Sequence, residues 1–215
     1  MFMSRRNFSL AAGMAAAVAL TAGALIASTA QAAPDAGEPV LAPDFTGTTA
    51  TGETISLSDF AGKTVILEWT NDGCPFVQKH YAVPPANMQG LQTDASESDV
   101  VWLSVISSAP GKQGHRTGAE VLDMNEGRGA TPAHVILDES GDIGRLYKAK
   151  TTPHMFLITA DGMIAYQGAI DDTPSARVSD IETATNYVSA AMQSVAAGEP
   201  VEVASSKPYG CSVKY

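Results

Sequence analysis

The sequence predicts a single α/β domain in which helices flank a central mixed β-sheet. Two apolar, β-branched runs, Thr64–Glu68 and Asp99–Ile106, have the composition of buried strands. Asp161-Gly162 separates two further apolar runs, which is a strong signal for a β-hairpin. Apolar residues recur at helical spacing from Val178 to Val195, so a long last helix is expected to pack one face on the sheet. Strands that alternate with helices and end in a hairpin and a helix make a mixed sheet covered on both faces.

The other elements follow in order, and turn residues, prolines and glycines place their ends. An N-terminal β-hairpin extension comes first, with strands at Pro43–Phe45 and Thr54–Leu57, and a helical turn at Ser58–Gly62 follows it. A helix after Cys74 is interrupted by Pro84-Pro85 and resumes toward Leu91. The remaining elements are a loop at Ser107–Gly118, a helix at Gly118–Asn125, a strand at Ala133–Asp138, a helix at Ile143–Lys148, and strands at Met155–Ile158 and Met163–Tyr166. Gly198 is expected to end the last helix and begin a C-terminal tail.

The N-terminus has the features of an export signal. Arg5 and Arg6 precede an Ala-rich apolar run, and Ala30-Gln31-Ala32 forms a small-x-small cleavage site. Because the two arginines stand in an Arg-Arg-x-Phe sequence, the twin-arginine route is expected. The alternative, a transmembrane anchor, is disfavoured by the shortness of the run and by its cleavage site. We therefore expect a periplasmic protein that does not insert stably into the membrane once its signal is removed. The expected organisation is a signal peptide at 1–32, a linker at 33–40, a domain at 41–197 and a tail at 198–215.

The charge of the chain argues against several classes of partner. The formal net charge is −10, and it becomes −12 when Arg5 and Arg6 are removed with the signal. An acidic protein is poorly suited to bind nucleic acid or an anionic membrane surface.

Export also decides the redox environment. The periplasm is oxidising, so the two cysteines of the chain, Cys74 and Cys211, can persist there as a disulfide.

The turn at Cys74 has the features of a reactive sulfur site. It follows the predicted strand Thr64–Glu68 through the polar residues Asn71-Asp72-Gly73, and Pro75 stands where proline is favoured at the start of a helix. A cysteine at a helix N-terminus faces free backbone N–H groups and the positive end of the helix dipole. This environment lowers a thiol pKa from about 8.5 into the range of roughly 3.5 to 7.5. The alternative, a small buried apolar residue, fits the polar turn less well.

Three segments carry a resemblance to a known family. They are Trp69–Tyr81, Thr151–Phe156 and Pro208–Tyr215. In this order they resemble exported members of the thioredoxin-like superfamily, in the redoxin or peroxiredoxin-like branch related to AhpC/TSA proteins. The resemblance implies a thioredoxin-like fold and thiol–disulfide chemistry at Cys74. It also implies that Pro153 is the cis-proline of the family, with the backbone of Thr152 presented to an extended substrate. An ordinary trans proline at the start of an edge strand is the alternative.

Two departures from the patterns of the family bear on the reaction. Valine stands at position 77, where the usual Cys-x-x-Cys motif has its second cysteine. The peroxiredoxin signature Pro-x-x-x-Thr-x-x-Cys is also absent, because Leu67 and Asn71 occupy its two other positions. Cys211, 137 residues after Cys74, is therefore the internal candidate to resolve a mixed disulfide.

This assignment requires the tail to fold back over the site. Gly210 would let the chain turn sharply, and Tyr209 would cover the sulfur with apolar surface. A disulfide further requires the two Cα atoms to lie within about 7 Å of each other.

Several polar residues are expected around the cysteine. Trp69 opens the segment, and His154, just after the proline, is the better candidate for the site. Lys79 and His80 follow the cysteine by five and six residues, so neither shares its helical face. Their exposure to solvent is therefore as well supported as a place in the site. Glu68 is an acid within an apolar strand, so it is either a buried proton relay or an exposed edge residue.

A metal site is not expected. Cysteine and histidine are suitable ligands for copper or zinc, and Cys74, His80, His154 and Cys211 are the available ones. The copper-delivering members of the superfamily use a Cys-x-x-x-Cys pair, and Gln78 breaks that pattern here. We therefore predict neither a metal nor another cofactor.

The predicted function is thiol–disulfide exchange. Cys74 would attack a protein or small-molecule disulfide, Cys211 would resolve the product, and an external thiol would serve as reductant. A peroxiredoxin-like thiol peroxidase acting on peroxide is the enzymatic alternative. A non-catalytic binding or metal-handling protein, with Cys74 and Cys211 as a structural staple or unbonded, is the alternative from another class. The sequence makes no prediction of the oligomeric state.

Overall fold

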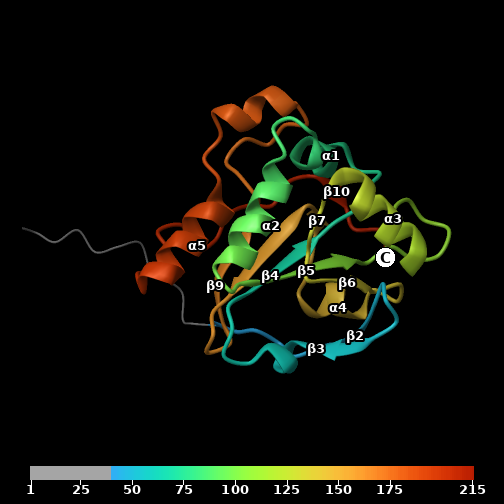
Figure 1. The fold of residues 1–215 in the computed structure, drawn as a ribbon, viewed down its shortest axis with the longest axis horizontal. Helices are drawn as coiled ribbons and strands as arrows, with labels where there is room; N and C mark the ends of the chain where they lie inside the picture. Colours follow the sequence, from blue (N-terminus) through green and yellow to red (C-terminus); the bar gives the residue numbers. More distant parts are fainter. Residues whose placement is uncertain (1–39) are drawn as a thin grey trace, which may run out of the picture. The chain divides into compact units, whose positions relative to one another are not determined.

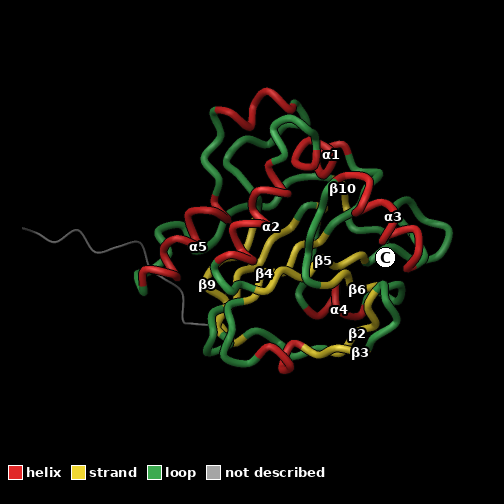
Figure 2. Tube along the Cα trace, in the orientation of Figure 1, coloured by secondary structure: helices red, strands yellow, loops and turns green. Residues whose placement is uncertain are grey.

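The computed structural model describes residues 40–215 of the chain. The expected signal peptide at 1–32, and all but the last residue of the expected linker, lie outside the described residues. Within 40–215 the chain forms an eight-stranded sheet with helices around it and a separate two-stranded sheet (Figure 1, Figure 2). The elements are β1 (Val40–Leu41), β2 (Thr46–Thr49), β3 (Thr54–Ser56), η1 (Leu57–Phe60), β4 (Val65–Trp69), α1 (Pro75–Tyr81), α2 (Asn87–Glu97), β5 (Val101–Ile106), α3 (Gly118–Arg128), β6 (His134–Leu137), α4 (Asp142–Leu146), β7 (Thr151–Thr152), β8 (His154–Ile158), β9 (Met163–Gly168), η2 (Val178–Glu182), α5 (Tyr187–Ala197) and β10 (Cys211–Ser212).

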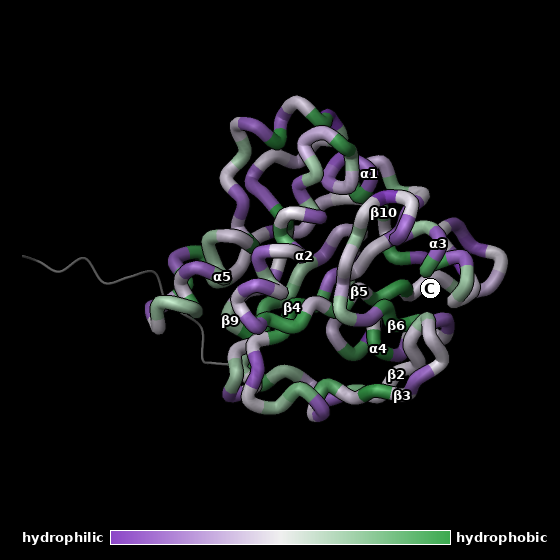
Figure 3. The backbone as a smooth tube through the Cα atoms, viewed as in Figure 1, coloured by the Kyte–Doolittle hydropathy of each residue, from purple (hydrophilic) through white to green (hydrophobic). Residues whose placement is uncertain are grey.

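Strand β4 lies in the middle of the larger sheet, whose order is β1-β9-β8-β4-β5-β6-β2-β3. It is parallel to β5 and antiparallel to β8, so the sheet is mixed, as predicted. All five residues of β4 are buried, because both faces of this strand are covered. Strongly hydrophobic residues concentrate in the central strands, whereas the helices and loops around them are more hydrophilic (Figure 3).

Two core clusters cover the two faces of the sheet. On one face, α1, α2 and α5 pack through buried residues such as Val77, Met88 and Val188. On the other face, Ile143 of α4 and the N-terminal segment around Phe45 pack against the strands. Successive side chains of a strand point to opposite faces, so neighbouring residues of β4 belong to different clusters.

The last helix differs from its prediction. The stretch from Val178 contains the short 3₁₀ helix η2, and α5 begins only at Tyr187. The break arises at Asn186, which pairs with Asp171 in an isolated β-bridge and therefore holds extended backbone. The Asn186 side chain then caps α5 by accepting the N–H of Ser189 at 2.9 Å. Helical spacing alone therefore overestimated the length of this helix.

The N-terminal hairpin is present, but its first strand lies at Thr46–Thr49 rather than at Pro43–Phe45. The reason is Asp44, whose carboxylate accepts the N–H groups of Phe45 and Ser58, each at 3.0 Å. The segment Pro43–Phe45 therefore forms a turn around the Asp44 side chain and does not pair as a β-strand.

The prolines after α1 interrupt the helix as predicted. Helix α1 ends at Tyr81, and α2 begins at Asn87.

Among residues 40–215, no helix combines the length and apolar character needed to cross a membrane.

Candidate active site

Cys74 stands at the N-cap of α1, directly after the turn that leaves β4. Asn71 shapes this turn, because its side-chain oxygen accepts the N–H of Gly73 at 3.0 Å and its backbone carbonyl accepts the N–H of Cys74 at 3.0 Å. Gln113, in the loop before α3, reaches back and donates to the carbonyl of Gly73 at 2.8 Å. The Cys74 side chain is fully buried, with 0% of its surface exposed.

The tail places Cys211 beside Cys74. Strand β10 pairs antiparallel with β7, and Cys211 lies opposite Thr152. The thiol of Cys74 donates to the carbonyl of the same Thr152 at 3.1 Å. The peptide bond between Thr152 and Pro153 is cis. Both cysteines are free thiols, and each affects the pKa of the other.

Gly210 is the residue that permits this approach. Its φ of 138° is unfavourable for residues with a side chain, and a Cβ there would lie 2.1 Å from the carbonyl oxygen of Thr152. The expected tail that folds back over the site is therefore present, and it occupies the backbone edge of β7 beside the cis-proline.

The two thiols have opposite pKa shifts. Burial raises the pKa of Cys74, but the Cys211 thiol, the N–H groups of Val77 and Cys211 and the Thr152 side chain favour its thiolate and outweigh burial, so the pKa is lowered. The Thr152 hydroxyl forms no hydrogen bond within the described part of the chain, so it is free to donate to that thiolate. Burial raises the pKa of Cys211 to about 11, and the hydrogen bond to Cys74 and its negative charge act in the same direction. Of the two thiols, Cys74 therefore loses its proton more readily, and Cys211 holds its proton more firmly.

Lys79 and His80 are buried, so the solvent-exposed interpretation was wrong. The ammonium of Lys79 lies 3.0 Å from the carboxylate of Asp171 and 3.3 Å from the hydroxyl of Tyr209. Tyr209 donates its hydroxyl to Asp171 and lies 3.3 Å from Nε2 of His80. We call these four residues the tail anchor, because Tyr209 stands two residues before Cys211.

The tail anchor changes two expectations. Tyr209 stacks edge-on against Phe76 at 5.8 Å between ring centroids, but its hydroxyl points to Asp171. Burial lowers the pKa of His80 to about 4, and the charge of Lys79 adds to the lowering while that of Asp171 opposes it. His80 is therefore neutral at pH 7. It joins the anchor as a hydrogen-bonding group and not as a cation.

Trp69 and His154 do not join the cluster that holds Cys74. They pair across β4 and β8 and therefore project from the same face of the sheet. Trp69 belongs to the opposite core cluster and donates its indole N–H to Ser107 at 3.0 Å. Because successive residues of a strand point to opposite faces of the sheet, Trp69 does not border the reactive sulfur, and that expectation was wrong.

Glu68 is buried in the centre of the sheet, so the exposed-edge alternative was wrong. Its carboxylate accepts hydrogen bonds from Tyr81 at 2.8 Å, Trp102 at 2.9 Å and Ser104 at 2.9 Å. These donors satisfy the acid and leave it a structural role in linking β4, β5 and α1.

Asp171 and the anchoring hydroxyl of Tyr209 are the site residues that sequence reasoning missed. Asp171 directly follows the buried pair Ala169-Ile170, which is an unusual place for an acid and is the one local signal available. Its partner Lys79 lies 92 residues away in the chain.

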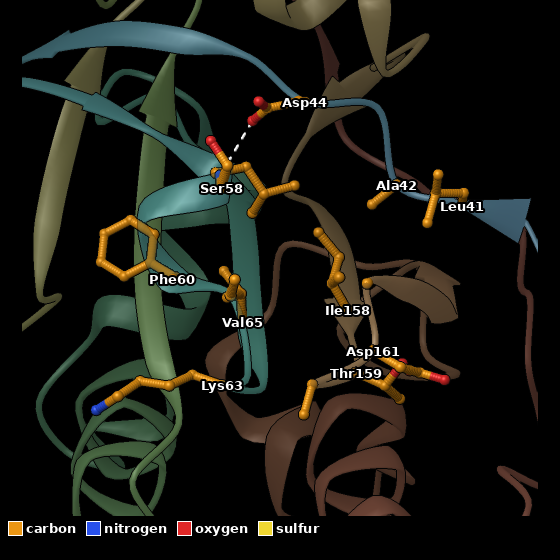
Figure 4. Close-up of a pocket in the computed structure, with 14 residues that line it drawn as sticks. Leu41, Ala42, Asp44, Ser58, Phe60, Lys63, Val65, Ile158, Thr159 and Asp161 are labelled. Atoms are coloured by element: carbon orange, nitrogen blue, oxygen red, sulfur yellow. Dashed lines mark hydrogen bonds between the residues drawn. The ribbon is translucent and has the colours of Figure 1, made fainter.

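Two further structural features bear on ligands. Among the described residues, no group of three or more His, Cys, Asp or Glu side chains is placed to hold a metal ion. An apolar pocket of about 260 Å³ lies between Leu41, Phe60, Val65 and Ile158 (Figure 4). It borders the start of β4, whereas Cys74 follows the end of that strand, so the pocket is remote from the sulfur chemistry.

The fold and the cysteine site define a thioredoxin-like protein. The sequence profile described as the AhpC/TSA family matches residues 40–167, and the chain belongs to that family. The structure is similar to that of an uncharacterized conserved protein from Geobacillus kaustophilus, with 22% identity, a TM-score of 0.67 and coverage of 82% of this chain and 91% of that one. A hypothetical protein from Sinorhizobium meliloti 1021 is similar at 20% identity and a TM-score of 0.64, with 82% and 93% covered.

A third similar structure is the thioredoxin domain of a thiol-disulfide oxidoreductase from Bacteroides vulgatus, at 20% identity and a TM-score of 0.48, with 67% of this chain and 94% of that one covered. No curated protein matches the chain. At these identities the solved structures show the fold alone.

Proposed function

We propose that the protein is a thiol–disulfide oxidoreductase in which Cys74 is the nucleophile and Cys211 the resolving cysteine. The observation that carries this proposal is the pairing of Cys211 with Thr152, whose carbonyl also accepts the Cys74 thiol. The tail thus lies on the backbone edge that the family resemblance assigns to an extended substrate. Membership of the AhpC/TSA family supports thiol chemistry at this site.

The proposed reaction has two exchange steps. The Cys74 thiolate attacks one sulfur of a substrate disulfide, which forms a mixed disulfide and releases the first substrate thiolate. Cys211 then loses its proton and attacks the sulfur of Cys74, which forms the Cys74–Cys211 bond and releases the second substrate thiolate. Substrate gains two electrons and the protein dithiol loses two.

The pKa of Cys211 provides the timing of the second step. In the reduced protein, burial keeps Cys211 protonated, and the hydrogen bond to Cys74 and the negative charge of Cys74 act in the same direction. A mixed disulfide removes that charge, so Cys211 then loses its proton more readily than in the reduced protein. Because Cys74 is fully buried beneath the docked tail, a bulky substrate must displace the tail before the first step.

The deciding experiment combines non-reducing peptide mapping with an activity measurement. We expect a linked Cys74–Cys211 peptide pair after oxidation and catalysed reduction of insulin in the presence of a thiol reductant. Two free thiols after oxidation, together with no exchange activity, would leave the non-catalytic alternative. A redox titration against glutathione then gives the potential of the pair.

Peroxide reduction is the second candidate, and family membership favours it. Against it, Asn71 stands where the peroxiredoxin signature has threonine, and its amide is occupied by Gly73 and by the carbonyl of Gln113 at 3.0 Å. We therefore expect peroxide consumption to be slower than disulfide exchange when both are measured on the same preparation.

We further propose periplasmic localisation through the twin-arginine route, supported by Arg5-Arg6 and the Ala30-Gln31-Ala32 site. Intact-mass measurement of the exported protein should show loss of residues 1–32. Unimpaired export of the Arg5→Lys/Arg6→Lys variant would contradict the route.

A further inference from the structure

A polar cavity of about 550 Å³ lies on the face of the sheet opposite the two cysteines. Its lining residue Tyr147 belongs to the core cluster that contains Trp69 and Phe156. Cys74 and Cys211 pack in the cluster on the other face, and neither of them lines the cavity. The cavity is therefore a place separate from the sulfur chemistry, and its own side chains decide what it can hold.

The polar side chains of the cavity are almost all hydrogen-bond donors. Its walls come from the segment before β7, from β8 and β9, and from the tail before β10. No carboxylate is among its lining residues. Lysine, histidine, glutamine and serine side chains can each donate a hydrogen bond. The residues of this kind are Lys148, Lys150, His154, Gln167, Ser205 and Lys207, and we call the cavity the lysine pocket.

The charge of the lysine pocket is opposite to that of the protein. Three of the seven lysines of the chain line it, although the formal net charge is −10. Within the described part of the chain, Lys148, Lys150 and Lys207 take part in no ion pair. Like charges gathered without counter-ions raise the local potential and attract an anion.

His154 adds a buried donor whose direction is fixed. Its side chain is 5% exposed, its ring stacks on Phe156 at 4.6 Å between centroids, and its Nδ1 accepts the N–H of Lys150 at 3.3 Å. An Nδ1 that accepts a hydrogen bond leaves the ring proton on Nε2. Among residues 40–215, Nε2 has no hydrogen-bond partner. Burial lowers the pKa of His154 to about 4, and the charge of Lys150 acts in the same direction, so this donor is neutral at pH 7.

The lysines of the pocket come from two segments that the backbone holds together. Lys148 and Lys150 precede β7, whereas Lys207 lies on the tail. The tail is fixed next to β9, because Gln167 donates its N–H to Ala204 at 3.1 Å and accepts that of Ser206 at 3.0 Å. The two groups of ammonium ions are thus brought to one cavity before any ligand arrives. A ligand with a single charge can neutralise only one group, and a ligand with two charges can neutralise both.

We propose that the lysine pocket binds a small oxyanion with two or more negative charges, carried by a phosphate group or by two carboxylates. The Nε2–H of His154 donates to one oxygen of this anion, and the ammonium groups of Lys150 and Lys207 donate to others. Hydrogen bonds from cations to anionic oxygens are about twice as strong as neutral ones, and several oxygens let one ligand accept from all of these donors. The proposal does not rest on the proposed function, because no cysteine takes part in it.

Binding is measured by NMR of the His154 ring at constant ionic strength. Inorganic phosphate and succinate should each shift the Nε2–H resonance saturably. Acetate, with one charge, and succinamide, with none, should bind at least about tenfold more weakly, equivalent to about 1.4 kcal/mol. Saturation by only one of phosphate and succinate would support the site and identify its source of charge. Saturation by neither, or equal affinity for acetate, would overturn the proposal.

Variants of equal net charge locate the binding. Lys150→Gln/Lys207→Gln should weaken binding of phosphate or succinate at least about tenfold. Lys63→Gln/Lys112→Gln is the control, because it removes two exposed lysines outside the pocket and leaves the same net charge. Equal weakening in the two double variants would show a general effect of charge and would overturn the site. Thermal unfolding without ligand checks that both variants fold.

A cysteine-free variant separates this proposal from the proposed function. Cys74→Ser/Cys211→Ser should bind phosphate or succinate with unchanged affinity, because neither cysteine lines the pocket. Loss of binding in this variant would contradict a separate site. Absence of disulfide exchange in a wild-type protein that binds the anion would overturn the proposed function and leave the lysine pocket supported.

Discussion

Cys74 and Cys211 lie side by side in surroundings that differ in almost every respect. Cys74 caps a helix that follows the central strand, and its side chain is fully buried in a core cluster. Cys211 belongs to a two-residue strand on a tail and is partly exposed. The first position is set by the packed sheet, and the second by the β7 ladder and the tail anchor. Two neighbouring thiols with opposite pKa shifts are thus positioned by separate parts of one fold.

The largest effect should come from replacing the cysteines one at a time. Cys74→Ser should lose disulfide-exchange activity, because the hydroxyl is a far weaker nucleophile than a thiolate. Cys211→Ser should still attack substrate but accumulate a mixed disulfide on Cys74, visible by intact-mass measurement. Accumulation of the adduct on Cys211 in Cys74→Ser, at the same rate, would reverse the assigned roles.

The next effect concerns the stability of the tail anchor. Asp171→Asn removes the charge facing buried Lys79, and loss of one partner of a buried ion pair costs about 3–5 kcal/mol. Asp99→Asn is the matched control, because its pair with Lys63 is exposed and such pairs contribute about 0–1 kcal/mol. Urea unfolding of both variants measures the difference. Equal losses would show that the buried pair does not hold the anchor.

A smaller effect should follow from Gly210→Ala. The new Cβ would meet the Thr152 carbonyl at 2.1 Å, which separates β10 from β7 and slows formation of the disulfide. Gly111→Ala is the control, since Gly111 also has a positive φ, 78°, but open space around it. Rates of disulfide formation in glutathione buffer compare the two. Unchanged kinetics in Gly210→Ala would mean that Cys211 does not depend on the ladder.

The smallest effect is on the pKa of Cys74. Because the Cys211 side chain donates to the Cys74 thiolate, Cys211→Ala should raise the pKa of Cys74 relative to Cys211→Ser, which keeps a hydroxyl donor. Alkylation by iodoacetamide should therefore reach half its maximal rate at a higher pH in Cys211→Ala. Superimposable pH profiles would assign the lowered pKa to the helix terminus alone.

The parts of this structure that sequence reasoning predicted are those encoded locally. The apolar run of β4, the turn at Asn71-Asp72-Gly73 and the proline after Cys74 each act within a few residues, so their pattern predicts strand, turn and helix start. The matched segment around Pro153 likewise predicted the cis bond.

The parts that sequence reasoning missed depend on distant partners. From the sequence, Lys79 can be interpreted as a surface residue, because its partner Asp171 lies 92 residues away in the chain. The same Asp171 pairs with Asn186 and thereby delays the start of the last helix. Nothing in the spacing of apolar residues encodes either contact, because the first requires the loop after β9 to lie beside α1 and the second requires it to lie beside the start of α5.

The order of the strands gives the proposed disulfide a mechanical consequence. Strand β4 precedes Cys74 in the chain, yet it lies between β5 and β8, which are both encoded between the two cysteines. A Cys74–Cys211 bond would close those strands into a covalent ring and leave β4 outside it. Under a pulling force applied at Val40 and Tyr215, tension would run along β4 and through the sulfur–sulfur bond, bypassing the ring. The oxidised domain would extend by a much shorter length than the reduced one, whose tail would peel away first.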